Sequence, residues 1–189
     1  MIETGAVITT FTTKNGSTAT LRYPSLSDAP ALLEFINTVS QEDSFIRFSG
    51  EQQTLQEEEE YVRSELEQIK NGDAVKIFCF VDSTLAGVCD IHRDVAFKKR
   101  KLHVGFQGII IAKGFRGQGI GQELMSATIA EAQQHIPGLK HIRLECFSTN
   151  TAALALYAKL GFVEVGRLPG ELLHRGQYID EVVLIKPLE

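Results

Sequence analysis

Four glycines lie between an apolar run and a segment with helical periodicity. Residues Ile109–Ile111 are typical of a buried strand, and four of the eight residues from Gly114 to Gly121 are glycine. Glycine lets main-chain N–H groups approach a ligand without a Cβ in the way. The helix that follows adds roughly half a positive charge at its N-terminus. Together with the guanidinium of Arg116, these features predict a site for an anion such as phosphate.

The spacing of these glycines argues against two common phosphate chemistries. A P-loop needs Lys-Ser or Lys-Thr after its glycines, and this segment has neither. The dinucleotide pattern G-x-G-x-x-G, started at Gly117 and Gly119, would need its third glycine where Gln122 stands. The pattern that remains is R-x-x-G-x-G, formed by Arg116, Gly119 and Gly121. A strand-to-helix turn with incidental glycines is the alternative interpretation.

A second group of polar residues follows about thirty positions further on. Ser148, Thr149 and Asn150 are candidates for the N-cap of a short helix, and Gly161 suits its C-terminal end. Asn150 and Tyr157 are seven residues apart, which is close to two helical turns. An amide and a phenol are therefore expected to face one cleft. The alternative for Tyr157 is a core aromatic side chain whose hydroxyl is satisfied.

These two motifs, in this order, resemble those of the GCN5-related N-acetyltransferases (GNAT). The signature of that family is [RQ]-x-x-G-x-[GA] after a central strand, and its second block is N-x-x-A followed by L-Y-x-x-x-G-F, as in 150–162 here. The resemblance covers roughly residues 20–187. Gly176–Val182 is similar to the last strand of bacterial members that acetylate small amines or protein N-termini.

The resemblance implies direct transfer of an acetyl group from acetyl-CoA to a primary amine of a small molecule or a protein N-terminus, in a ternary complex. A non-catalytic module that keeps the acyl-CoA pocket as a sensor or an assembly surface is the alternative, and transfer of a longer acyl group is a third reading. The family pattern assigns the pantetheine arm to main-chain groups of Ile109, Ile110 and Ile111 and to the side chain of Asn150. It assigns the pyrophosphate to N–H groups of Arg116, Gly117, Gln118, Gly119, Ile120 and Gly121.

Such a reaction needs a base and an acid. An amine with a pKa near 10 must lose a proton before it can attack, and the thiolate that leaves must gain one. Tyr157 is the expected acid. Some family members carry a Glu on the strand before the loop, but 102–112 contains no carboxylate. Glu145 on the adjacent strand is the first candidate for the base, followed by Glu42 or Asp43, and a water chain is the remaining route. The residues of 102–112 that could order water are His103 and Gln107.

The elements that must position these residues follow from periodicity and turn signals. The predicted strands are 7–11, 18–23, 74–81, 85–92, 102–112, 141–147, 162–167 and 178–186, with a hairpin turn at Asn15-Gly16. The predicted helices run from a cap at Ser27-Asp28 to Val39, over 55–70, from the glycine loop to Ile136, and over 151–160. This order predicts one domain over 1–189 of the α/β (α+β) class. Its single central sheet is expected to be mixed, mostly antiparallel and flanked by helices.

Composition narrows the partners and the compartment. The 189 residues carry a net charge of −5, which argues against general binding to nucleic acid or to an anionic membrane. No apolar run approaches the roughly 20 residues of a membrane-spanning helix, and the first residues do not resemble a signal peptide. Cys79, Cys89 and Cys146 form no C-x-x-C pair, and the five histidines show no ligand spacing. We expect a cytoplasmic, metal-free protein with an amine-bearing acceptor; a homodimer is compatible with these features.

Overall fold

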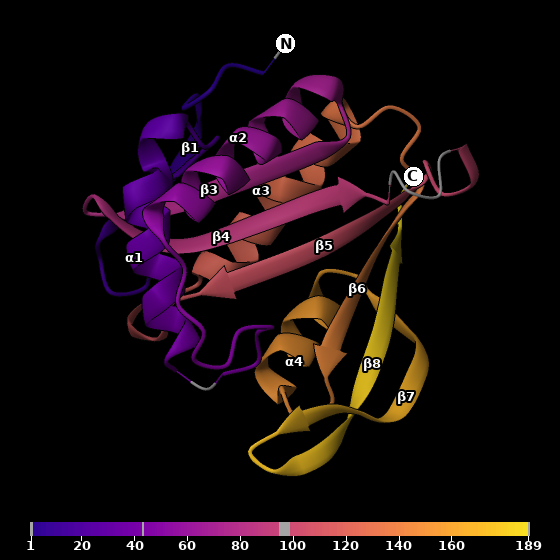
Figure 1. Ribbon diagram of the computed structural model, residues 1–189. Helices are drawn as coiled ribbons and strands as arrows, with labels where there is room; N and C mark the ends of the chain where they lie inside the picture. Colours follow the sequence, from indigo (N-terminus) through magenta and orange to yellow (C-terminus); the bar gives the residue numbers. More distant parts are fainter. Residues whose placement is uncertain (1, 43, 95–98, 189) are drawn as a thin grey trace.

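The computed structural model describes residues 2–42, 44–94 and 99–188. Eight strands form one sheet in the order β1-β2-β3-β4-β5-β6-β8-β7 (Figure 1). The strands are β1 (Val7–Thr12), β2 (Thr18–Arg22), β3 (Ala74–Val81), β4 (Thr84–Arg93), β5 (Val104–Ile111), β6 (His141–Phe147), β7 (Val163–His174) and β8 (Gln177–Pro187). The helices are α1 (Ala29–Ser40), α2 (Leu55–Asn71), α3 (Ile120–His135) and α4 (Thr151–Lys159). The order of elements and the mixed sheet flanked by helices confirm the predicted fold class.

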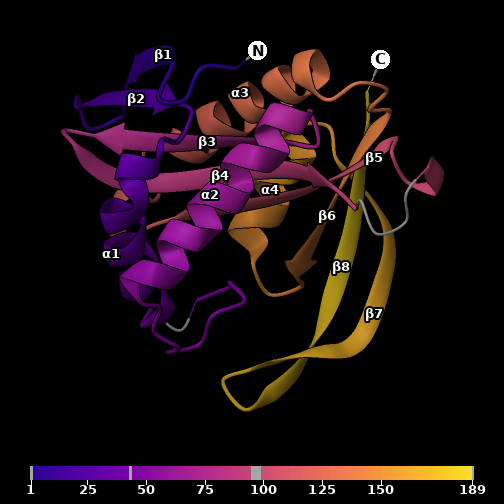
Figure 2. The same cartoon turned by 45° about the horizontal axis from the view of Figure 1, so that its top comes forward.

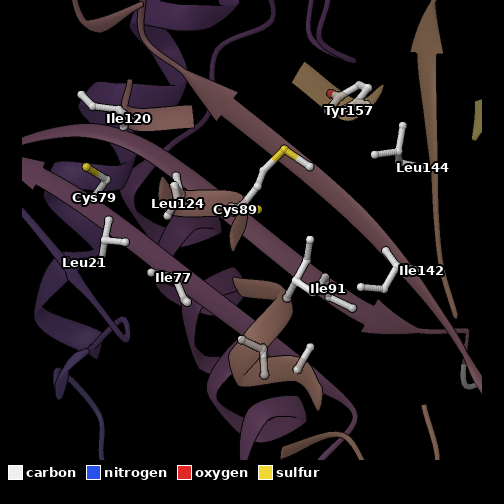
Figure 3. Close-up of a cluster of buried hydrophobic side chains, with 14 of the residues drawn as sticks. Leu21, Ile77, Cys79, Cys89, Ile91, Ile120, Leu124, Ile142, Leu144 and Tyr157 are labelled. Carbon is white, nitrogen blue, oxygen red and sulfur yellow. The ribbon is translucent and has the colours of Figure 1, made fainter. Parts of the chain in front are cut away.

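The helices cover both faces of the sheet. On one face α1 and α2 lie side by side across β3 and β4 (Figure 2), and Phe35, Val62 and Phe78 are buried between them. On the other face α3 and α4 pack on a larger hydrophobic cluster that includes Cys89 and Tyr157 (Figure 3). Each helix presents an apolar stripe to the sheet, so burial of these stripes holds the layers together.

One strand pair is parallel, and it separates after three residues. Val104, Gly105 and Phe106 of β5 pair with 141–143 of β6, and from Gln107 onward the two strands no longer pair with each other. Beyond that point β5 stays paired with β4, whereas β6 stays paired with β8. Each strand therefore follows its own half of the sheet, and Figure 1 shows the two diverging. This separation opens the space in which the candidate site lies.

The start of α1 differs from the prediction in how its cap is made. A short 3-10 turn over Leu26–Asp28 precedes the helix, and Asp28 takes the N-cap position without a side-chain capping bond. Its carboxylate accepts hydrogen bonds from the Arg22 guanidinium at 2.6 and 2.8 Å and from the Ser25 N–H at 2.7 Å. The charge of Arg22 outcompetes the helix N–H groups for this side chain, so Asp28 ties the helix to β2.

The strand predicted over 162–167 is too short. In the structure β7 extends to His174 and forms a long hairpin with β8. Pro169-Gly170 reads as a strand terminator in the sequence. Here these residues lie within a register shift between Leu168 and Leu172, on a strand at the edge of the sheet. An edge strand tolerates a proline because the missing N–H is not needed for pairing.

Candidate active site

A cleft of about 1260 Å³ lies where β5 and β6 separate. Small-molecule pockets usually measure about 300–1,000 Å³, so this cleft has room for a long ligand together with a second one. It collects most of the site residues that the sequence predicts. Those that line it are Ile109, Ile110, Ile111, Arg116, Gly117, Gly119, Gly121, Glu145, Asn150 and Tyr157.

The edge of β5 offers main-chain hydrogen bonds to this cleft. The Ala112 N–H donates to the carbonyl of Ala86, a residue of β4, at 3.0 Å. In an antiparallel ladder, successive residues direct their N–H and carbonyl groups alternately toward the paired strand and away from it. By that alternation Ile110 faces β4, whereas the main-chain groups of Ile109 and Ile111 face the gap. The Ile111 carbonyl already accepts a bond from Arg116 at 2.8 Å. Ile109 is therefore the residue whose N–H and carbonyl can both pair with an extended ligand.

The glycine loop forms the end of the cleft at the start of α3. Gly117 has φ +76° and Gly119, the N-cap of the helix, has φ +90°, which are backbone angles that side-chain-bearing residues rarely adopt. Gly121 lies in the first turn of the helix. The first N–H groups of a helix have no partner within it, so those of Gly119 and Gly121 are available to an anion. Gly114 does not line the cleft and has no positive φ.

The Arg116 side chain is committed to two partners. Its Nε donates to the Ile111 carbonyl, and its Nη2 contacts the carboxylate of Glu42. The other Glu42 oxygen accepts from the Lys113 N–H at 3.0 Å. Arg116 thus ties the loop to β5 and to the segment after α1, and its charge is paired with Glu42. The second candidate for the base is therefore an ion-pair partner here, and Asp43 lies outside the described residues.

Two of the predicted loop residues do not line the cleft. Ile120 is 1% exposed and belongs to the core below the loop. Gln118 donates from its side chain to the Gly114 carbonyl at 2.9 Å, and its own carbonyl accepts from the N–H of Lys14 at 3.1 Å. The side chains of both residues hold the shape of the loop. Their main-chain contacts with a ligand stay a prediction.

Local motifs at both ends of α4 place the two polar residues of the second block. Asn150 is the N-cap, and its Oδ1 accepts from the Ala153 N–H at 3.3 Å. At the other end Gly161 has φ +86°, and the Phe162 N–H donates back to the Tyr157 carbonyl at 3.0 Å. This is a helix-ending motif in which the residues three before and two after the cap usually touch. Accordingly, the rings of Tyr157 and Phe162 are 6.0 Å apart.

Tyr157 belongs both to the core and to the cleft. It is 8% exposed, packs in the cluster shown in Figure 3, and also lines the cleft. Burial raises the pKa of its hydroxyl well above the usual value, and the nearby Cys146 and Cys89 add to this effect. The hydroxyl therefore stays protonated in neutral and mildly alkaline solution. Such a group can donate a proton or a hydrogen bond inside the cleft.

Two carboxylates line the cleft opposite the loop. Glu145 on β6 has a side chain that is 42% exposed and lies 2.5 Å from the Arg143 guanidinium. Glu181 on β8 pairs with Phe147 in the ladder, and partial burial together with Glu145 and Glu171 raises the pKa of its carboxyl. Glu181 is not among the site residues predicted from the sequence. The only available signal was its place in the segment that resembles the last strand of the family.

An aromatic group at the same end joins three distant segments. Phe45, which lies between α1 and α2, has its ring 5.6 Å from Phe147 and 5.0 Å from His174. Phe147 and His174 are 5.5 Å apart, and all three residues line the cleft. No pattern in the sequence connects them. Lys14, which lines the cleft from the β1–β2 turn, was missed for the same reason.

Within the described ranges, no cluster of three or more His, Cys, Asp or Glu side chains is suited to a metal ion. In the same part of the chain, no helix has both the length and the apolar character needed to cross a membrane. The three cysteines are buried and free.

A split sheet with a glycine loop at a helix N-terminus and a buried phenol in one cleft suits a long, phosphate-bearing ligand. The sequence profile described as the Acetyltransferase (GNAT) family matches residues 38–162, which is more than half of the chain. The chain therefore belongs to the GNAT acetyltransferase family, and the resemblance carried by its two motifs is confirmed.

Individual relatives match parts of the chain. The chain is 37% identical to N-alpha-acetyltransferase MAK3 of Arabidopsis thaliana over 60 residues, which are 32% of this chain and 30% of that protein. It is 36% identical to phosphinothricin N-acetyltransferase of Alcaligenes faecalis over 80 residues, which are 42% of this chain and 40% of that protein. The matched segments thus span less than half of either relative. A GNAT-family acetyltransferase from Streptococcus pneumoniae has a similar structure, with a TM-score of 0.82 and 28% identity over 90% of this chain and 99% of that one.

Proposed function

We propose that this protein transfers an acetyl group from acetyl-CoA to a primary amine, carried by a small molecule or by a protein or peptide N-terminus. The observation that carries the proposal is a single cleft that contains an anion-binding loop, a free strand edge and a buried, protonated phenol. The loop would bind a pyrophosphate, the strand edge would pair with an extended pantetheine arm, and the phenol would protonate the departing thiolate. The three free cysteines fit a reducing compartment such as the cytoplasm.

The binding roles follow from which groups are free. The N–H groups at Gly117, Gly119 and Gly121 would hold the pyrophosphate, since Arg116 is paired with Glu42. Ile109 would pair with the pantetheine amides as a neighbouring strand would. The Oδ1 of Asn150 is used by the helix cap, so its contribution to the ligand would come from its amide N–H₂.

The chemical step needs one proton removed and one supplied. The amine nitrogen bonds to the thioester carbon, the carbon–sulfur bond breaks, and the sulfur leaves as a thiolate. Tyr157 would give its hydroxyl proton to that sulfur and regain one from solvent. Glu145, through water or directly, would take the proton of the amine, because it lines the cleft and is still in contact with solvent.

The acceptor is expected to be a cationic amine before it reacts. Glu145 and Glu181 line this end of the cleft, and the rings of Phe45, Phe147 and His174 would contact the apolar part of the acceptor. Carboxylates attract an ammonium group and aromatic faces also favour a cation. One relative is named for N-alpha-acetylation and another for phosphinothricin, so both kinds of acceptor belong in a screen.

The proposal is tested by ligand binding and then by turnover with the full chain. Acetyl-CoA should raise the melting temperature, because a ligand that binds the folded state at 100 times its Kd adds about 2.7 kcal/mol. Release of CoA is then measured with a panel of polyamines, amino acids, small-molecule amines and peptides with free N-termini. Release that depends on an amine supports the proposal. Binding without release from any amine favours the non-catalytic module, and no shift at millimolar acetyl-CoA contradicts both.

A further inference from the structure

The turn between β1 and β2 packs against the glycine loop. The Lys14 N–H donates to the Gln118 carbonyl at 3.1 Å. The Cγ and Cε atoms of Lys14 each lie 3.9 Å from the point where a Cβ on Gly119 would be. Lys14 also lines the cleft together with the loop glycines. A side chain from more than a hundred residues earlier in the chain therefore lies across the loop.

The turn that carries Lys14 is held by its own hydrogen bonds. The hydroxyl of Thr13, which is 3% exposed, lies 3.0 Å from the Ser17 carbonyl oxygen and 2.5 Å from the Asn15 Oδ1, and its one hydrogen is directed to these two acceptors. The Thr13 N–H also donates to the Ser17 carbonyl at 2.9 Å, and Gly16 takes φ +91° to close the turn. Because the backbone on both sides is fixed, little backbone conformational freedom is lost when Lys14 binds a ligand.

The cations nearest to the loop have different partners. Arg116 is paired with Glu42 and bonded to the Ile111 carbonyl. Lys159 donates to the Gln122 side chain at 2.6 Å. The structure records no hydrogen bond or ion pair of the Lys14 ammonium group with any described residue. Lys113, at the start of the loop, does not line the cleft, so Lys14 is the described cation beside the loop glycines whose charge stays available to a ligand.

We propose that Lys14 binds a phosphate group of the CoA ligand and supplies the positive charge that the loop needs. The proposal rests on the proposed function, because it takes CoA as the ligand of this cleft. The main-chain N–H groups of the loop orient a phosphate but carry no net charge, and the chain as a whole is negative at −5. An ammonium group on a flexible stem acts as a compact charge that follows a phosphate. The phosphate is either the pyrophosphate or the ribose 3′-phosphate, and the test separates the two.

The test compares Lys14→Met, which removes the charge and keeps most of the length, with Lys14→Arg, which keeps the charge. Calorimetric Kd values are measured for CoA, dephospho-CoA and pantetheine, which lacks both phosphate sites. We expect Lys14→Met to weaken CoA binding about tenfold, as for the loss of one charge-assisted hydrogen bond. Lys14→Arg should bind within about threefold of the wild type, and pantetheine binding should not change. Lys140→Met, at an exposed lysine outside the cleft, controls for net charge.

The outcomes separate the two phosphates and the two proposals. An equal loss for CoA and dephospho-CoA assigns Lys14 to the pyrophosphate, and a loss confined to CoA assigns it to the 3′-phosphate. An unchanged Kd in Lys14→Met overturns the role of Lys14 and leaves the proposed function standing. An equal loss for pantetheine overturns it as well, since the effect would then be structural. A wild-type chain that binds no CoA overturns the proposed function and this inference with it.

Discussion

At the scale of single residues, burial separates the two groups that are proposed to move protons. The ring of Tyr157 lies in the core, and the same burial raises the pKa of its hydroxyl, so the proton is retained until it is needed. The Glu145 side chain is 42% exposed and contacts Arg143, so it can exchange protons with water. A buried hydroxyl that keeps its proton suits the role of the acid, and a carboxylate in contact with water suits that of the base.

Replacing Tyr157 by Phe should lower kcat by about 100-fold, the usual contribution of a general acid. The Kd for acetyl-CoA should stay within about twofold, because the ring and its packing are kept. In the wild type, the raised pKa keeps the acid form present as pH increases to about 10, so Tyr157 should cause no loss of kcat up to that pH. Steady-state kinetics and calorimetry measure the two quantities. An unchanged kcat in the variant would show that Tyr157 is not the acid.

At the scale of elements, the glycine loop is built by two glycines with a positive φ and two without. Gly117 and Gly119 need the left-handed region to turn the chain from β5 into α3. Gly121 has no positive φ, but a Cβ there would lie 3.3 Å from Leu156 of α4. Gly114 has neither constraint. The loop therefore depends on Gly117 and Gly119 for their backbone angles, on Gly121 for space, and on Gly114 for neither.

Gly119→Ala should lower the free energy of unfolding by about 1–2 kcal/mol, the cost of an L-residue in the left-handed region. It should also weaken acetyl-CoA binding, because the N-cap of α3 moves. Gly114→Ala is the matched control and should change stability by no more than about 0.5 kcal/mol, since nothing lies within 4 Å of its new Cβ. Urea unfolding of both variants measures the difference. Equal stability of the two would mean that the backbone at Gly119 is not strained by a side chain.

At the scale of the whole molecule, one buried cation joins α2 to the sheet. Lys76 on β3 is 3% exposed, and its Nζ lies 3.0 Å from Glu65 of α2 and 3.9 Å from Asp90 of β4, with the Tyr61 hydroxyl also bonded to it. Burial alone would raise the pKa of Asp90, but Lys76 and His92 outweigh it and hold that pKa below its usual range. Burial would lower the pKa of Lys76, but Asp90, Tyr61 and Glu65 raise it above its usual value.

Removing this charge should destabilise the fold in a way that depends on pH. Lys76→Met leaves Glu65 without its cation and Asp90 with His92 alone, and removing one partner of a buried ion pair typically costs about 3–5 kcal/mol. A lowered carboxyl pKa contributes stability above the unfolded pKa of about 3.9, and that contribution is lost as pH falls through the lower folded value. A raised lysine pKa contributes stability below about pH 10.4 and loses it as pH rises further. The loss in Lys76→Met should therefore be largest near neutral pH and smaller near pH 3, roughly where carboxylates become protonated.

Denaturant unfolding at a series of pH values measures this dependence. Lys140→Met, which removes an exposed charge, is the control and should stay close to the wild type throughout. A loss of the same size at all pH values would mean that packing, and not the ion network, accounts for the effect of Lys76→Met.

The sequence by itself determined the elements and the two motifs, because the signals for both are local. Periodicity and turn residues predicted the order of strands and helices, and the spacing of Asn150 and Tyr157 predicted that these two residues face one cleft. The family resemblance implied that the glycine loop shares this cleft, and all of Gly119, Gly121, Asn150 and Tyr157 line it. At one predicted strand, the local signal conflicts with the pairing in the sheet. Pro169-Gly170 reads as a terminator, but pairing with β8 carries the strand past it.

The tertiary structure alone decided how the cleft is completed. Lys14, Phe45, His174 and Glu181 come from segments that no short-range pattern connects, and they line the one cleft that opens where β5 and β6 separate after three pairs. The partner of Arg116 was likewise not readable from the motif, since Glu42 lies far away in the sequence. Local propensity depends on neighbours along the chain, whereas these contacts depend on how two halves of one sheet are held apart.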